Sequence, residues 1–329
     1  MPELPEVEVV RAGLEPAVTG ATVSSATVFD ERSLRRHTGP AEDFIDRLEG
    51  RIIASAERRG KFLWLPLAPA VPAAAVPVLK TKDIPAERPR KDGFGAPAPR
   101  TPSFSVGEGG SEALVVHLGM SGQVLLRDRE TDDRLTRIRI ELEHAVHGPL
   151  RLNFVDQRIF GSMAIDRLIQ TPDAPNDLVP TQVAHIARDP LDPLFDDTLF
   201  LARLARRNTG VKRALLDQTL LSGVGNIYAD EALWAARVHY DQPTSTLSRP
   251  RAKLLLAEVR LVLAKALGEG GTSFDAQYVN VNGASGYFSH SLNAYGQQGK
   301  PCPRCGRPIT RVSFMNRGSH FCAFCQRVR

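Results

Sequence analysis

The sequence predicts an α+β protein in which an N-terminal helix and an antiparallel β-sandwich precede a helix-two-turns-helix domain and a four-cysteine hairpin. Three observations predict this order. Short alternating apolar runs separated by turns fill residues 21–165, as in antiparallel strands. From Asp196 the apolar period becomes helical, and all four cysteines lie in the last thirty residues. The expected units are 1–168, a linker at 169–195, 196–290 and 291–329.

The first predicted element is a helix that begins at Pro5. Proline is favoured in the first helical turn, and Glu6 adds an acid there. Val7, Val10 and Leu14 recur at helical spacing, so they should form one buried face.

The residues before this helix could carry chemistry. Pro2 is small, so we expect Met1 to be removed, which leaves a secondary amine. Such an amine condenses with an aldehyde to give an iminium cation, an electron sink for eliminations. An α-amino group titrates near pH ~8, so part of it is nucleophilic at neutral pH. Glu3 is a candidate proton donor or acceptor beside it. Alternatively, Pro2 and Pro5 only begin a helix.

Strands are expected in six alternating segments, at Ile52–Ala56, Phe62–Leu65, Leu114–His117, Gln123–Leu126, Ile138–Leu142 and Leu150–Phe154. Residues 66–112 interrupt them with a segment rich in proline and alanine. This segment has little to bury, so we interpret it as a disordered or polyproline-like surface insertion. Five prolines in Thr171–Pro193 indicate the linker between domains.

The helical part contains a glycine turn, Gly223-Val224-Gly225-Asn226, between two helices. Glycines let backbone amides approach an anion, and Asn226 could cap the second helix. Five basic residues before the turn favour a phosphate as that anion: Arg203, Arg206, Arg207, Lys212 and Arg213. Helices are expected at Leu199–Arg207, Val211–Leu221, Asn226–Ala236 and near Pro250–Leu267.

The C-terminal module has the spacing of a metal site. Cys302 and Cys305 form one Cys-x2-Cys pair, and Cys322 and Cys325 form a second. Four thiolates complete a tetrahedral shell, so one structural Zn²⁺ is expected; two disulfides or a redox pair are the alternatives. The span between the pairs should form a hairpin with its tip near Gly318, and the metal would supply folding energy.

Charge and hydropathy limit the possible functions. The net charge is +5, and residues 300–329 hold seven Lys or Arg and no acid, which indicates a polyanionic partner more than a uniform charge would; a solvated basic tail is the alternative. No apolar run is long enough for a transmembrane helix, and the N-terminus lacks the pattern of a signal peptide. We therefore expect no membrane partner and a cytoplasmic, nucleoid-associated location.

Six motifs in order resemble the formamidopyrimidine-DNA glycosylases and their endonuclease VIII relatives. They span nearly the whole chain outside the proline-rich insertion. The matching residues are Pro2-Glu3-Leu4-Pro5-Glu6-Val7-Glu8, Arg59-Gly60-Lys61, His117-Leu118-Gly119-Met120-Ser121-Gly122, Arg158-x-Phe160-Gly161, Gly223-Val224-Gly225-Asn226-Ile227-Tyr228, and the cysteine hairpin with Arg317.

The resemblance implies a bifunctional DNA glycosylase and AP lyase that removes oxidised purines from duplex DNA, as a monomer. Pro2 would form the Schiff base and Glu3 would protonate the sugar. Lys61 would serve β-elimination and phosphate contact, and Arg317 would serve δ-elimination. The residues implied to fill the hole left by the flipped base are Met120, Arg158 and Phe160, and those implied to contact DNA phosphates are Arg207, Lys212, Asn226 and Tyr295.

Other features of the resemblance are weaker. Gly270–Phe288 matches the loop that caps the extruded base. About forty extra residues follow the Lys61 strand, and Arg134–Arg137 lacks the family's histidine, which an arginine could replace. Arg207 stands where a lysine is common.

Three other functions stay open. The first is the branch of the family that excises oxidised pyrimidines, although Leu4 and the Arg158-x-Phe160 pair favour the purine branch. The second is a protein that binds damaged DNA without cleaving it, and the third is a zinc-stabilised structural module. Separately, Lys61 could be a solvated charge, Met120 a core residue and Phe160 a strand aromatic.

Overall fold

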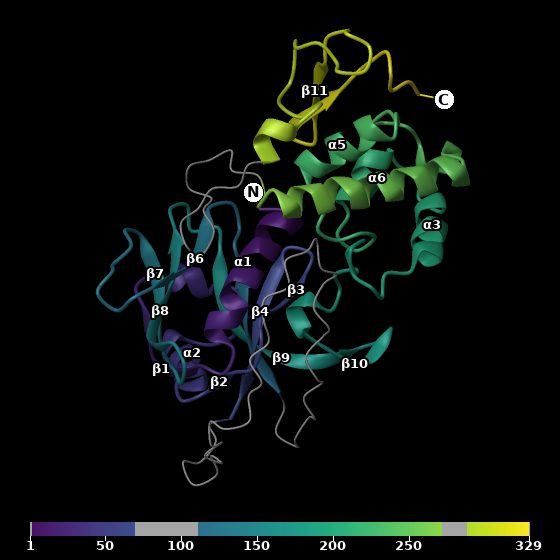
Figure 1. Ribbon diagram of the computed structural model, residues 1–329. Helices are drawn as coiled ribbons and strands as arrows, with labels where there is room; N and C mark the ends of the chain where they lie inside the picture. Colours follow the sequence, from purple (N-terminus) through teal and green to yellow (C-terminus); the bar gives the residue numbers. More distant parts are fainter. Residues whose placement is uncertain (1, 70–110, 272–287, 329) are drawn as a thin grey trace, which may run out of the picture.

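The computed structural model describes residues 2–69, 111–271 and 288–328, and Figure 1 shows their arrangement. Most of the predicted insertion (66–112) and most of the predicted capping loop (270–288) lie outside the described residues. Helix α1 (Leu4–Val18) lies between the sheet and the helical part of the chain (Figure 1). It begins one residue before Pro5, since Glu3 is its N-cap. The predicted buried face of Val7, Val10 and Leu14 is confirmed.

The described strands β1 to β10 form one antiparallel sheet in the order β10-β9-β5-β4-β2-β1-β7-β8-β6, with β3 paired to β4. Their bounds are Thr22–Val28, Ile52–Ile53, Glu57–Arg59, Phe62–Ala68, Glu112–His117, Gly122–Arg127, Thr136–His144, Gly148–Asp156, Ser162–Thr171 and Ala174–Pro180. The six expected strand segments all lie on this sheet, although the first shrinks to two residues.

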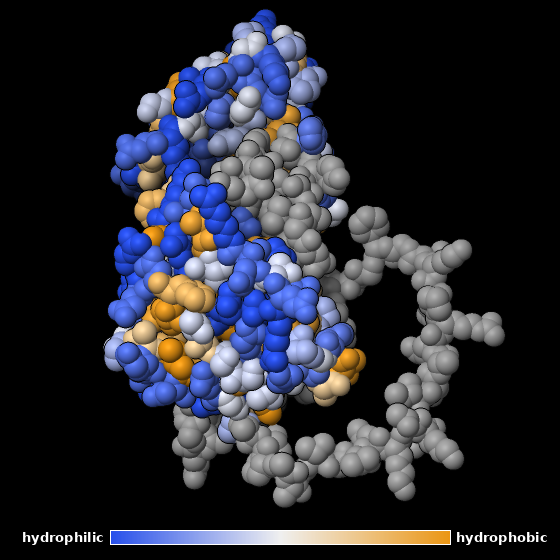
Figure 2. Space-filling model, turned by 90° about the vertical axis from the view of Figure 1, so that its left-hand side faces the viewer, coloured by the Kyte–Doolittle hydropathy of each residue, from blue (hydrophilic) through white to orange (hydrophobic). Residues whose placement is uncertain are grey.

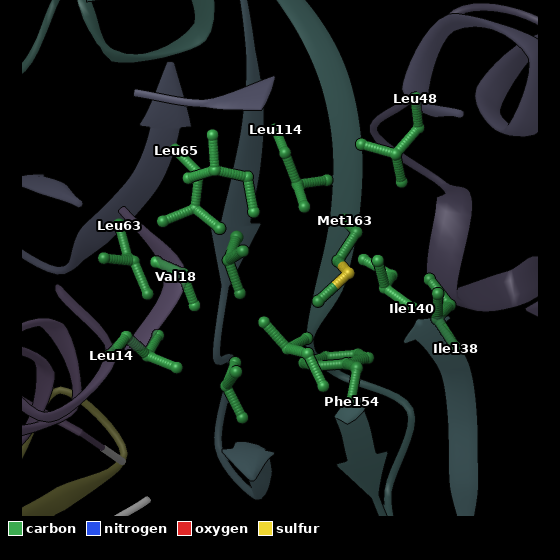
Figure 3. Packing of buried hydrophobic residues seen from close by; sticks show 14 of the residues in the cluster. Leu14, Val18, Leu48, Leu63, Leu65, Leu114, Ile138, Ile140, Phe154 and Met163 are labelled. Carbon is green, nitrogen blue, oxygen red and sulfur yellow. The ribbon is translucent and has the colours of Figure 1, made fainter. Parts of the chain in front are cut away.

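The sheet curls around a large hydrophobic core. Leu114 of β5 and Met163 of β9 share this core with Ile138 of β7 and Phe154 of β8 (Figure 3). Because these strands lie far apart in the sheet order, the two halves of the sheet must face each other. Leu14 of α1 lies in the same core (Figure 3).

Two elements differ from the sequence prediction. Residues Ala41–Leu48 form helix α2, with Phe44 and Leu48 buried at i and i+4, within the region interpreted as strands. It follows a 3-10 turn at Glu31–Leu34. The range 169–195 contains β10, which pairs with β9, so the sheet continues into the predicted linker. Prolines fit β10 because it is an edge strand and need not donate there.

The helical part has its own core. It contains α3 (Asp197–Ala205), α4 (Val211–Leu216), α5 (Asn226–Ala235) and α6 (Arg249–Gly268), with 3-10 turns at Thr181–Val183, Thr244–Thr246 and Phe288–Ser291. Leu4 of α1 packs in this second core, whereas Val7 packs in the first. The first turn of α1 therefore joins the two cores, and the Leu4 amide donates to the Gly223 carbonyl at 2.9 Å.

The C-terminal hairpin consists of β11 (Thr310–Phe314) and β12 (Arg317–Phe321). Its tip is Met315–Asn316, which both have positive φ, as a two-residue type I′ turn requires. The tip predicted near Gly318, in Asn316-Arg317-Gly318, is therefore displaced toward the N-terminus and includes only Asn316 of those residues. Gly318 lies within β12, where a Cβ would come within 2.6 Å of the Arg311 side chain.

The surface shows no apolar belt on the face in Figure 2, where hydrophilic residues predominate and apolar ones are scattered. Among the described residues, no helix combines the length and hydropathy needed to span a bilayer.

Candidate active site

The carboxylate of Glu3 lies buried at the N-terminus of α5, where it accepts backbone hydrogen bonds from Gly225 (2.8 Å), Ile227 (3.1 Å) and Tyr228 (3.4 Å). A Cβ at Gly225 would overlap this carboxylate, so the position requires glycine. The anion that approaches these amides is thus a side chain of the chain itself. The prediction that the glycine turn holds a phosphate is wrong for this conformation.

Burial makes Glu3 a weak acid. Its pKa is raised from 4.5 to about 7, mainly because burial removes water and also because the nearby Glu6 is negatively charged. Lys61 and the amides of Ile227 and Tyr228 lower the pKa but do not cancel the effect of burial. A carboxyl group with this pKa can hold a proton at neutral pH and release it during a reaction.

Glu6 and Tyr228 support the position of Glu3. The Glu3 amide donates to Glu6 at 2.8 Å, and the Tyr228 hydroxyl donates to the other Glu6 oxygen at 2.5 Å. Helices α1 and α5 are therefore tied together at the point where the chain carries Pro2, which is itself buried. No pattern of residues around Tyr228 indicates this role in advance.

Lys61 comes to the same place from the turn between β3 and β4. Gly60 has a φ of 58°, and a Cβ there would lie 2.8 Å from Ser222, so this turn packs tightly against the glycine turn. Burial lowers the pKa of the half-buried Lys61 amine. Glu3 raises it, while the Arg317 guanidinium lowers it further. Lys61 therefore lies in the electrostatic field of both predicted partners.

Arg317 is exposed at the start of β12, and hydrogen bonds to α5 hold the residues that follow it. Asn226 Nδ2 donates to the Gly318 carbonyl at 3.0 Å. Asp230 accepts from the Ser319 hydroxyl at 3.1 Å and from the His320 amide at 2.8 Å. The start of α5 thus holds both Glu3 and the strand that carries Arg317. The predicted N-cap role of Asn226 is wrong, since Gly225 is the N-cap.

The predicted phosphate contacts differ in accessibility. Lys212 is 0% exposed, and its Nζ lies 2.6 Å from Asp230, so it cannot reach a phosphate in this conformation. The prediction for Lys212 is corrected accordingly. Arg207 is partly exposed and forms an ion pair with Asp217 at 2.6 Å. Asn226 is buried, and Tyr295 is half-buried beside the finger, where its ring contacts His320.

Met120, Arg158 and Phe160 lie on two adjacent loops. Met120 and Phe160 are 39% and 46% exposed, although both are large and apolar, and Arg158 is exposed as well. Gly119 packs against the backbone of Phe160 so closely that a Cβ there would overlap it. The alternative that Met120 is a core residue is therefore wrong.

His117 is a site residue that the sequence reasoning left unassigned. It lies opposite Phe62 in the β4–β5 register, and the two rings are 5.0 Å apart. Its pKa is lowered to about 4, mainly by burial and also by the nearby charges of Arg36, Arg35 and Lys61. It is neutral at pH 7, and no described group bonds its buried Nδ1. The position of His117 in the strand register, beside the turn that carries Lys61, is the feature that indicates its place in the site.

The four cysteines fit one zinc ion. The sulfurs of Cys302, Cys305, Cys322 and Cys325 all lie within 4.8 Å of one another. With Zn–S bonds of ~2.3 Å, tetrahedral ligands would lie about 3.8 Å apart, which agrees with this spacing. The Trp234 indole donates to Cys302 at 3.4 Å, so α5 also contacts the metal-binding end of the hairpin.

Three family models match the chain. The formamidopyrimidine-DNA glycosylase N-terminal domain matches residues 1–163, and the H2TH domain of the same glycosylase matches residues 186–277. A zinc finger found in FPG and IleRS matches residues 299–328.

Relatives and solved structures match the chain over nearly its full length. The formamidopyrimidine-DNA glycosylase of Leifsonia xyli subsp. xyli is 57% identical, with 100% of both chains covered. That of Streptomyces avermitilis is 49% identical over 99% of this chain and 98% of its own. A Thermus thermophilus FPG crystal structure matches at 31% identity and a TM-score of 0.71, covering 99% and 98%. The Lactococcus lactis Fpg in complex with DNA containing N7-benzyl-Fapy-dG matches at 27% identity and a TM-score of 0.73, covering 99% of each chain.

Proposed function

The chain belongs to the formamidopyrimidine-DNA glycosylase family, and on this premise we propose that it excises oxidised purines from duplex DNA and then cleaves the strand. The substrates are 8-oxoguanine and formamidopyrimidines. One structural observation supports this activity in addition to membership of the family. Lys61, from the β3–β4 turn, interacts electrostatically with both Glu3 at the N-terminus and Arg317 of the finger, and the pKa of Glu3 near 7 suits proton transfer.

Pro2 is the nucleophile in this proposal, after removal of Met1. Its nitrogen bonds to C1′ of the damaged nucleotide as the bond from C1′ to the base breaks, and the proton that the nitrogen loses passes to the departing base. The sugar ring then opens as Glu3 gives a proton to the ring oxygen, which leaves an iminium ion between C1′ and Pro2. Because Glu3 has a pKa of about 7, a large fraction carries this proton at neutral pH.

Lys61 and Arg317 serve the two eliminations. The lowered pKa of Lys61 increases its neutral fraction, so its amine can accept the C2′ proton as the 3′ phosphate leaves. The planar guanidinium of Arg317, with its several N–H donors, is suited to stabilise the departing 5′ phosphate. This division of roles follows the family pattern and is supported by the electrostatic influence of Arg317 on Lys61.

DNA contact is assigned to groups around these residues, which are exposed or half-buried except for the buried Asn226. Met120, Arg158 and Phe160 fill the space of the flipped nucleotide, since apolar side chains offset lost stacking and a guanidinium can pair with the orphaned cytosine. Arg207, Asn226 and Tyr295 remain proposed phosphate contacts, and His117 joins them as a neutral donor. Zn²⁺ holds the finger in shape and takes no part in the chemistry. The protein would act as a monomer on the nucleoid.

The proposed nucleophile can be identified by borohydride trapping on a duplex with 8-oxoguanine opposite cytosine. We expect a covalent adduct that peptide mass spectrometry assigns to Pro2, because reduction fixes the iminium as a stable amine. A duplex with thymine glycol, tested side by side, separates the purine branch from the pyrimidine branch. An unmodified duplex is the control.

Two results would contradict the assignment of Pro2 as the nucleophile. A protein with a confirmed free proline terminus that binds the lesion tightly but gives no adduct would be a damage-binding protein. An adduct on Lys61 in place of Pro2 would reverse the assigned roles.

Arg317→Ala should change the products more than the rate of excision. We expect the ratio of β- to δ-elimination product to rise at least about tenfold, because a lost charge-assisted contact is worth roughly 1.5–3 kcal/mol. Gel separation of the two 3′ ends measures it. Arg311→Ala is a matched control, since Arg311 is exposed on the other strand of the same hairpin. Equal ratios in both variants would remove Arg317 from the δ step.

A further inference from the structure

We infer that Asp156 is a positioning residue that fixes the loops carrying Met120, Arg158 and Phe160 in shape before DNA is bound. The inference rests on the proposed function, which assigns these three residues to the space left by the flipped nucleotide. Asp156 itself would contact neither DNA nor the reacting atoms. It is 0% exposed at the end of β8 and lies beneath the loops.

The sheet brings the two loops together. One loop joins β5 to β6 and the other joins β8 to β9. Strand β5 pairs with β9, and β6 pairs with β8. Each loop therefore connects one of these two strand pairs to the other. Gly122 and Asp156 are partners in the register at this crossing. The wedge residues Met120, Arg158 and Phe160 are therefore neighbours because of strand order.

The carboxylate of Asp156 bonds both loops at once. One oxygen accepts from the Ser121 hydroxyl at 2.5 Å and from the Arg158 amide at 3.0 Å. The other accepts from the Gly161 amide at 2.7 Å. Met120 is thus next in sequence to Ser121, and Phe160 is next to Gly161. Arg158 donates to Asp156 through its own amide. A short buried carboxylate can place three donors more firmly than exposed loop contacts can.

The backbone between the donors is strained. Ile159 has a φ of 55°, a conformation that is unfavourable for a β-branched residue. Such a conformation persists only where surrounding contacts determine it. Arg35 supplies more of these contacts, since it donates to the Ile159 carbonyl at 2.8 Å and to the Phe160 carbonyl. The strained residue separates Arg158 from Phe160 and so sets their relative directions.

Asp156→Asn tests the inference with little change in volume. The amide keeps one oxygen but turns an NH₂ donor toward a backbone N–H of Arg158 or Gly161. We expect excision from an 8-oxoguanine–cytosine duplex in single turnover to fall roughly 10- to 100-fold, the cost of hydrogen bonds to a charged group. The preference for cytosine over adenine as the opposite base should shrink, because it depends on where Arg158 lies.

Two further measurements separate positioning from folding. Cleavage of a single strand with a preformed abasic site has no opposite base to read and no duplex to open, so it should change less than about twofold. Asp166→Asn is a matched control. Asp166 also accepts from one hydroxyl (Thr181, 2.7 Å) and two amides (Gln182, 2.8 Å; Arg167, 2.9 Å), and these bonds hold none of the wedge residues. It should match wild type in every assay.

The outcomes decide the inference in each case. Duplex excision by Asp156→Asn within twofold of wild type would overturn it, and so would an equal loss on the abasic single strand. If Asp156→Asn does not fold, the exposed Arg35→Gln carries the test. The same selective loss of duplex excision supports the inference, and its absence overturns it. A wild-type protein that excises no oxidised purine would instead contradict the proposed function.

Discussion

Glu3→Gln should slow excision of 8-oxoguanine by about 10²- to 10⁴-fold, the usual contribution of a positioned proton donor. Glutamine is nearly the same size and keeps one oxygen that can accept from the amides of Gly225 or Ile227. It cannot give a proton to the opening sugar. Single-turnover excision at saturating enzyme measures the effect on the chemical step rather than on binding.

The pH dependence of wild type should identify the same group. Burial raises the pKa of Glu3 to about 7, so its protonated fraction falls as pH rises through 7. The amine of Pro2 loses activity in the other direction, as it becomes protonated at low pH. Excision should therefore fall on both sides of neutral pH. A wild-type profile that stays flat between pH 6 and 8 would contradict the role given to Glu3.

Stability offers a second measurement of Glu3. The folded state holds its proton up to about pH 7, whereas the unfolded chain loses it near pH 4.5. Between these values the unfolded state binds fewer protons, so the free energy of unfolding falls as pH rises. Relative to Glu3→Gln, wild type should lose roughly 3 kcal/mol from pH 4.5 to above 7.

Cys322→Ser should remove the finger from the folded protein. Zinc contributes about 10–16 kcal/mol of apparent free energy in finger peptides, and a thirty-residue module has too little core to replace it. The small finger core consists of Cys302, Ile309 and Cys322, so the variant loses a ligand and a core residue together. We expect the bound zinc to be lost, which a colorimetric metal assay on the purified protein measures.

Loss of the finger should also disable the site from a distance. Ser319 and His320 would no longer bond Asp230, so Arg317 would not be held beside Lys61. Affinity for lesion DNA should fall, with a shallower dependence on salt because fewer cations meet the phosphates. Ser313→Ala, at an exposed position of the same hairpin, is the control. A variant that keeps one zinc and wild-type affinity would show that the finger folds without Cys322.

The sequence by itself determined the features that depend on local spacing. The buried face of α1 follows from helical periodicity, and the four helices of the second half lie close to their predicted ranges. Cysteine spacing identified the metal ligands, because two Cys-x2-Cys pairs can surround an ion with little help from the rest of the chain. Alternation also located the six expected strand segments, although it gave neither their order in the sheet nor β10.

Only the tertiary structure decided which polar groups are buried and what they face. Glu3 meets the amides of α5 more than two hundred residues away, and its burial at this place raises its pKa to about 7, although the amides themselves lower it. The same holds for Lys212, a basic residue in the sequence that is fully buried against Asp230. The role proposed for Asp156 could be inferred only from the strand order, which places two loops above this residue. Desolvation and hydrogen bonding act through space, so residue type and local spacing do not reveal them.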